Sequence, residues 1–156
     1  MLAYVEYLVS LVKHTDETVV IQSDDRILEG FRYEKEVEHF LKNAVEKDLF
    51  EVYYQPVYWI KEERYITLEA LSRLKHPNMG MIPPDVFIGI AERQGLIAQI
   101  GLLQLRRVCR FIKENEHIMD SIRNVKFNLS PSELLKPGHS QVLIDIIKEF
   151  GLSPAY

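Results

Sequence analysis

A change in the spacing of apolar residues near residue 50 constrains the fold more than any other feature of this sequence. From Tyr33 to Glu46 the apolar residues recur at helical spacing, which predicts an amphipathic helix. The spacing then becomes alternate, and Phe50–Ile60 and Tyr65–Arg73 predict two strands rich in aromatic and β-branched residues. Because only the charged turn Lys61–Arg64 separates them, the two strands are expected to pair in the antiparallel sense.

Helices dominate the predicted remainder of the chain. After the strand pair we expect a loop at His76–Pro84, a helix from Pro84 to Gly95, a longer helix over 102–112, a strand at Val125–Leu129 and a helix at Ser140–Phe150. Nearer the N-terminus we expect a helix at Leu2–Lys13 and a short strand at Thr18–Gln22. The order predicts a parallel α/β arrangement with an antiparallel start.

The composition is that of a soluble globular domain. The 156 residues are 47% hydrophobic and 27% charged, and the net charge is −4 without any basic block. Broad binding to DNA or RNA is therefore not expected, although one or two local cations could hold a small anionic ligand.

Three further features favour a cytoplasmic protein. The single cysteine, Cys109, allows no disulfide framework and lies among apolar residues of a helical pattern, so it is expected to be a packed thiol. No apolar run reaches membrane-spanning length. The apolar stretch from Met1 to Leu11 contains Glu6 and has no basic start, so we do not expect a signal peptide.

Glu69 and Arg73 are the first candidates for chemistry. Residues two apart in a strand share a face, so both side chains are expected on the same side near the strand's end. They could serve a metal and a phosphate, respectively, or they could form an ordinary cross-strand ion pair. Spacing alone favours the ion pair.

Asn128 and Gln55 are the other candidates. Asn128 is unusual inside a strand and could either cap the following Ser130-Pro131 turn or offer its amide oxygen to a ligand. Gln55 could bind a base or a phosphate, or could simply precede a proline that interrupts the strand ladder. The five histidines show no ligand spacing, so none is assigned to a metal.

Five short blocks then occur in order over residues 48–156. They are Tyr54-Gln55-Pro56, Leu68-Glu69-Ala70-Leu71-Ser72-Arg73, Ile82-Pro83-Pro84-Asp85-Val86-Phe87-Ile88, Ala91-Glu92-Arg93-Gln94-Gly95-Leu96-Ile97 and Phe127-Asn128-Leu129-Ser130. Together they resemble the N-terminal half of an EAL domain, the cyclic di-GMP phosphodiesterase family. Glu69-Ala70-Leu71 is the signature that names this family.

The resemblance implies an α/β fold, a partial TIM-like barrel with an antiparallel first strand pair that stops after roughly half the barrel. The family hydrolyses cyclic di-GMP to linear pGpG with two Mg²⁺ or Mn²⁺ ions. By resemblance, Glu69 and Asn128 are metal ligands. Gln55, Leu71 and Arg73 line the nucleotide site, with Arg73 on a phosphate.

The family's further acidic ligands lie beyond the last matching block, so we expect this chain alone to be inactive. The alternative is a non-catalytic module that binds cyclic di-GMP or associates with itself, and an open barrel edge predicts a homo-oligomer. Residues 1–25 weakly resemble the C-terminal tail of a GGDEF-like domain. Residues 26–47 would then be a connecting amphipathic helix and 48–156 the half EAL domain.

Overall fold

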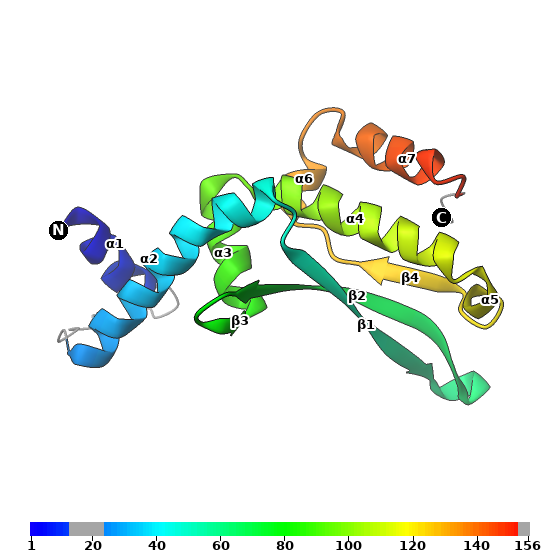
Figure 1. Ribbon diagram of the computed structural model, residues 1–156, viewed down its shortest axis with the longest axis horizontal. Helices are drawn as coiled ribbons and strands as arrows, with labels where there is room; N and C mark the ends of the chain where they lie inside the picture. The colour runs from blue at the N-terminus through cyan, green and yellow to red at the C-terminus, as the bar shows by residue number, and fades with distance from the viewer. Residues whose placement is uncertain (13–23, 153–156) are drawn as a thin grey trace.

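The computed structural model describes residues 1–12 and 24–152, and the strand expected at Thr18–Gln22 lies outside these residues. Figure 1 shows a long helix leading into a small mixed sheet that helices accompany on one side. The elements are α1 (Leu2–Ser10), α2 (Asp25–Glu46), β1 (Phe50–Trp59), η1 (Ile60–Glu62), β2 (Arg64–His76), β3 (Gly80–Ile82), α3 (Pro84–Gln94), α4 (Ile97–Glu114), α5 (Glu116–Met119), β4 (Asn124–Phe127), α6 (Pro131–Leu134) and α7 (His139–Glu149).

β2 is the central strand of the sheet. It pairs with β1 in the antiparallel sense from Phe50↔Leu74 to Trp59↔Arg64, with one irregularity at Val57/Tyr58. Its other edge pairs with β4 in the parallel sense and, further along, with β3 in the antiparallel sense. The predicted α/β fold, with an antiparallel start followed by parallel pairing, is therefore confirmed.

The loop predicted at His76–Pro84 is wrong in part, because it contains β3. The His76 ring closes the turn between the strands: its Nδ1 accepts hydrogen bonds from the backbone N–H groups of Asn78 and Met79, each at 3.2 Å. Gly80 follows with φ of 76°, a left-handed conformation that suits glycine. Pro77 lies in the turn and Pro83 and Pro84 follow β3, so none of the three interrupts the ladder.

α2 begins eight residues earlier than its apolar spacing predicts, at Asp25 and not Tyr33. The reason is a cap: Asp24 accepts a hydrogen bond from the Ile27 backbone N–H at 2.9 Å. The added turns contact α1, where the Tyr7 and Phe31 rings lie 5.5 Å apart. α1 itself ends at Ser10, short of the predicted Lys13.

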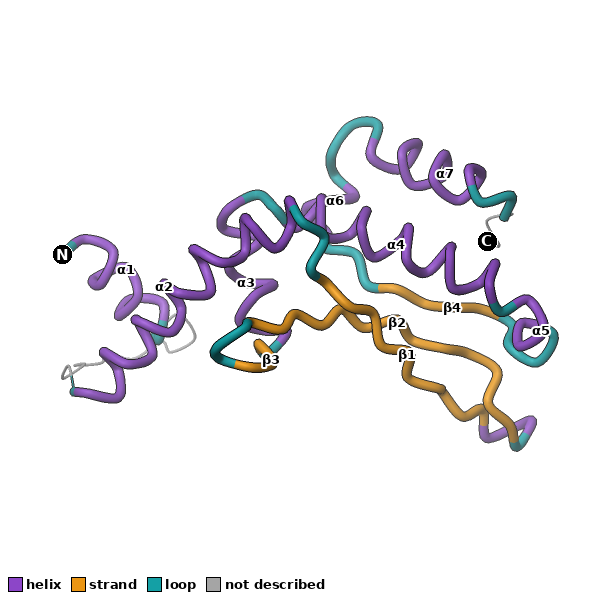
Figure 2. The backbone as a smooth tube through the Cα atoms, viewed as in Figure 1, coloured by secondary structure: helices purple, strands orange, loops and turns teal. Residues whose placement is uncertain are grey.

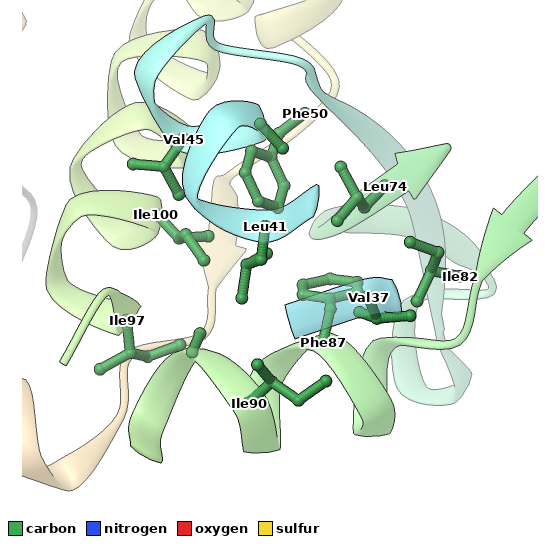
Figure 3. Packing of buried hydrophobic residues seen from close by; sticks show 12 residues of the cluster. Val37, Leu41, Val45, Phe50, Leu74, Ile82, Phe87, Ile90, Ile97 and Ile100 are labelled. Carbon is green, nitrogen blue, oxygen red and sulfur yellow. The ribbon is translucent and has the colours of Figure 1, made fainter. Parts of the chain in front are cut away.

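The main core lies where α2, α3 and the ends of β1 and β2 meet. Figure 3 shows Leu41 of α2 among side chains from these elements. The cluster consists of Val37, Leu41, Ala44, Val45, Phe50, Leu74, Ile82, Phe87, Ile90, Ala91, Ile97 and Ile100. The second half of α2 thus packs into the same core as the strands.

A second cluster joins α4 to α7. It contains Leu105, Leu143, Ile146 and the expected packed thiol, Cys109, which is buried. Figure 2 shows α4 running beside the strands, with α7 on its far side. Within the described part of the chain, no helix is long and apolar enough to cross a membrane.

Candidate functional site

The candidate residues of β1 and β2 share one face of the sheet. Gln55 is the register partner of Glu69, and Tyr53 is the partner of Leu71. Directly opposed residues of an antiparallel pair point to the same side, and alternate residues of β2 continue the row to Arg73. Four of the five predicted site residues therefore line up across two strands.

The fifth residue, Asn128, reaches the same place from the end of β4. β4 runs parallel to β2 with Lys126 opposite Glu69. One residue past the strand, the Asn128 amide Nδ2 donates a hydrogen bond to Glu69 Oε1 at 3.2 Å. The two predicted metal ligands, 59 residues apart in sequence, are thus in direct contact.

The oxygen atoms at this contact suit a hard cation as ligands. Glu69 Oε1 accepts the amide hydrogen, which leaves Glu69 Oε2 and Asn128 Oδ1 as oxygen ligands of the kind that Mg²⁺ binds. Among residues 1–12 and 24–152 there is no cluster of three or more His, Cys, Asp or Glu side chains that could hold a metal. The residues present fit part of a metal site.

Arg73 does not form the ion pair with Glu69 that spacing alone favoured. Its guanidinium lies over the Tyr53 ring, 5.7 Å from the ring centre, and its Nη1 donates to the Ser72 carbonyl at 3.0 Å. Cation–π contact and a backbone acceptor hold the side chain while leaving other guanidinium N–H groups for an anion.

A cavity of about 410 Å³ lies between β2, α3, the start of α4 and the residues that follow β4. Its polar lining includes Arg73, Glu92, Asn128 and Ser130. Gln55 and Glu69 lie outside it. A larger hollow of about 800 Å³ follows the charged face of α2, and none of the candidate site residues lines it. Of these two, only the smaller cavity adjoins the candidate site, through Leu71, Arg73 and Asn128.

The opposite face of the sheet packs on α4. The Tyr54 ring stacks on Phe111 with ring centres 3.9 Å apart, and Gln104 Nε2 donates to the Ala70 carbonyl at 2.8 Å. Burial raises the pKa of the Tyr54 phenol to about 12, although nearby Arg107 acts in the other direction. These contacts hold β1 and β2 against α4 on the face opposite the candidate site.

Sequence reasoning missed three residues at the site. Tyr53 carries a findable signal, because it alternates with Gln55 and so shares its face. Glu92 and Ser130 form a hydrogen bond of 2.8 Å across 38 residues, from Ser130 Oγ to Glu92 Oε1. Only the folded chain shows that contact.

Comparison with known proteins identifies the family to which this chain is related. The EAL domain family model matches residues 39–156. The cyclic di-GMP phosphodiesterase NbdA of Pseudomonas aeruginosa is 40% identical over 80 residues, which is 51% of this chain and 10% of that protein.

Two solved structures are similar in fold. The PaMucR phosphodiesterase in its c-di-GMP complex has a TM-score of 0.70 and 30% identity, over 76% of this chain and 48% of that one. The FimX EAL domain of Pseudomonas aeruginosa, bound to c-di-GMP, has a TM-score of 0.65 and 25% identity, over 76% and 46%. The present chain spans less than half of each of these relatives, and it belongs to the EAL domain family.

Proposed function

We propose that this chain is the N-terminal part of a domain that hydrolyses cyclic di-GMP to linear pGpG. The observation that carries the proposal is the contact between Glu69 Oε1 and Asn128 Nδ2, beside the C-terminal end of the parallel ladder between β2 and β4. In barrel enzymes, functional residues gather at these C-terminal strand ends. The named relatives NbdA and PaMucR are phosphodiesterases, which supports the reaction class.

In this proposal Glu69 and Asn128 hold Mg²⁺ or Mn²⁺. A bound metal of this kind would lower the pKa of a water and offset charge on the reacting phosphate. Arg73 binds a phosphate of the dinucleotide through guanidinium N–H groups, and Tyr53 keeps it in place. Gln55 and Leu71 flank the nucleotide on the same face.

We expect the 156-residue chain to be inactive by itself. Mg²⁺ requires near-octahedral oxygen coordination, and one carboxylate with one amide cannot fix two such ions. The purified chain should therefore hydrolyse cyclic di-GMP no faster than buffer with Mg²⁺ or Mn²⁺ present, measured by chromatography of pGpG. Metal-dependent turnover well above buffer would contradict this expectation.

The intact parent domain provides the positive test. There, Glu69→Gln removes the ligand charge while keeping the side-chain shape, and pGpG formation should be lost. Glu149→Gln is the matched control, because Glu149 instead pairs with Arg106 of α4 at 2.6 Å. Unchanged turnover in Glu69→Gln would remove Glu69 from the metal site.

A non-catalytic role through self-association is the second candidate. β1 lies at the edge of the sheet, and Ile60 at the hairpin tip is 83% exposed beside exposed Trp59 and Tyr65. An uncovered strand edge with apolar neighbours favours pairing with another chain. We expect a homodimer or larger assembly by light scattering, and a monomer at high concentration would contradict it.

The domain boundaries remain part of the proposal. Residues 1–25 are proposed as the tail of a GGDEF-like domain, 26–47 as a connecting helix whose second half also packs into the core of the EAL half, and 48–156 as the half EAL domain. A cytoplasmic location suits a buried thiol and a nucleotide second messenger as ligand. Residues 48–156 expressed alone should be less stable than the whole chain, because α2 supplies core side chains. Equal stability of the two would show that the EAL half does not need α2.

A further inference from the structure

The contact between Glu92 and Ser130 links α3 to the chain that carries Asn128. Ser130 Oγ donates to the Glu92 carboxylate at 2.8 Å, and Ser130 is two residues beyond Asn128. Both residues line the 410 Å³ cavity together with Asn128. Hydrogen bonds to an ionised carboxylate are stronger than bonds between neutral groups.

Asn128 lies just outside the region that the sheet holds in place. The last register pair between β2 and β4 is Ala70↔Phe127, so Asn128 is the first residue past the ladder. Its own amide bond to Glu69, at 3.2 Å, is at the long end of the usual range. The position of the Asn128 side chain therefore depends on what fixes the next residues.

α3 offers a firm support for those residues. Phe87, Ile90 and Ala91 of this helix are buried in the main core. At its last turn, Arg93 Nη2 donates to Glu34 of α2 at 3.0 Å. Glu92 therefore projects from an element that the core and α2 both hold.

We propose that Glu92 is a positioning residue of the candidate metal site, acting through Ser130 on Asn128. This inference rests on the proposed function for its meaning in catalysis, since Asn128 is a proposed ligand. Residues behind a ligand fix its orientation, and their loss costs about 10- to 100-fold in metal affinity. By holding Ser130, Glu92 thus fixes the orientation of the Asn128 side chain.

The test uses the whole chain labelled with ¹⁵N and follows the Asn128 side-chain amide by NMR, first without metal. In Glu92→Ala and in Ser130→Ala, we expect that resonance to shift and its hydrogens to exchange faster. The double variant should match Ser130→Ala, because Glu92 acts on Asn128 only through Ser130. Glu92→Gln should stay near wild type, because its amide oxygen still accepts from Ser130 Oγ.

The matched control is Glu149→Ala, which breaks another carboxylate contact, the one with Arg106. It should leave the Asn128 amide unchanged. An unchanged Asn128 resonance in Glu92→Ala, or a Glu92→Gln variant as perturbed as Glu92→Ala, would overturn the positioning role.

A Mn²⁺ titration of the same samples separates this inference from the proposed function. Glu92→Ala should need about 10-fold more Mn²⁺ to broaden the Asn128 signal than wild type. If wild type shows no broadening at all, the metal site is refuted, while the metal-free spectra still decide whether Glu92 positions Asn128.

Discussion

Replacement of Leu41 by alanine tests whether α2 is an integral part of the domain. Leu41 is fully buried, at 0% exposure, among side chains of α3 and the strands. Figure 3 shows neighbours on several sides of it, so the surrounding structure has little freedom to close the space that the substitution leaves. A helix that only connected domains would not depend on this side chain.

The expected cost follows from burial and the cavity. Removing a buried leucine side chain down to alanine loses about 2 kcal/mol of transfer free energy. A cavity term in a site that cannot relax brings the total to about 3 kcal/mol. For a domain whose whole stability is about 5–15 kcal/mol, this loss is large.

Urea denaturation followed by circular dichroism measures the effect. With a slope of about 2 kcal/mol per molar urea, the unfolding midpoint should fall by about 1.5 M. Leu135→Ala is the control, because the same atoms are removed where the side chain is 84% exposed. A Leu41→Ala midpoint that shifts no more than the control would refute the packing of α2 into the core.

Two predictions concern groups that the sheet and helices bury. The Tyr54 pKa of about 12 lies above the ordinary 10.0, so the phenol stays neutral to higher pH in the folded state than in the unfolded state. The contribution of this group to folding stability is therefore complete below pH 10 and is lost as the pH rises through 12. In an ultraviolet titration, Tyr54→Phe should remove one phenol from the most alkaline part of the curve, and an unchanged titration curve in that variant would contradict the assignment. Burial also raises the pKa of the Cys109 thiol, so a thiol reagent should react slowly with the native chain and quickly in denaturant. Equal rates in both conditions would contradict its packing.

The strand pair and the row of site residues on β2 could be predicted because alternation is local. Glu69 and Arg73 share a face by spacing alone, whatever the rest of the chain does. The short link between Phe50–Trp59 and Arg64–His76 also left little choice of pairing. The resemblance to the EAL family then gave functional roles to Glu69 and Arg73, for which spacing alone favoured an ordinary ion pair.

Other features depended on contacts that spacing does not encode. β3 is only three residues long and is held by its pairing and by the His76 ring, against the proline-rich composition around it. The early start of α2 depends on the Asp24 cap, which by itself suggests a turn. The register that sets Gln55 opposite Glu69, and the bond from Ser130 to Glu92, join distant segments.

Paramagnetic broadening by Mn²⁺ tests the central claim, that Glu69 and Asn128 form part of a metal site, most directly. Mn²⁺ added to the ¹⁵N-labelled chain should broaden the Asn128 side-chain amide, the residues around Glu69 and the end of β4 before other signals. Glu69→Ala should abolish this selective loss, because the carboxylate supplies the charged ligand next to the Asn128 amide. Broadening that is equally strong in Glu69→Ala, or that begins elsewhere in the described chain, would contradict the account.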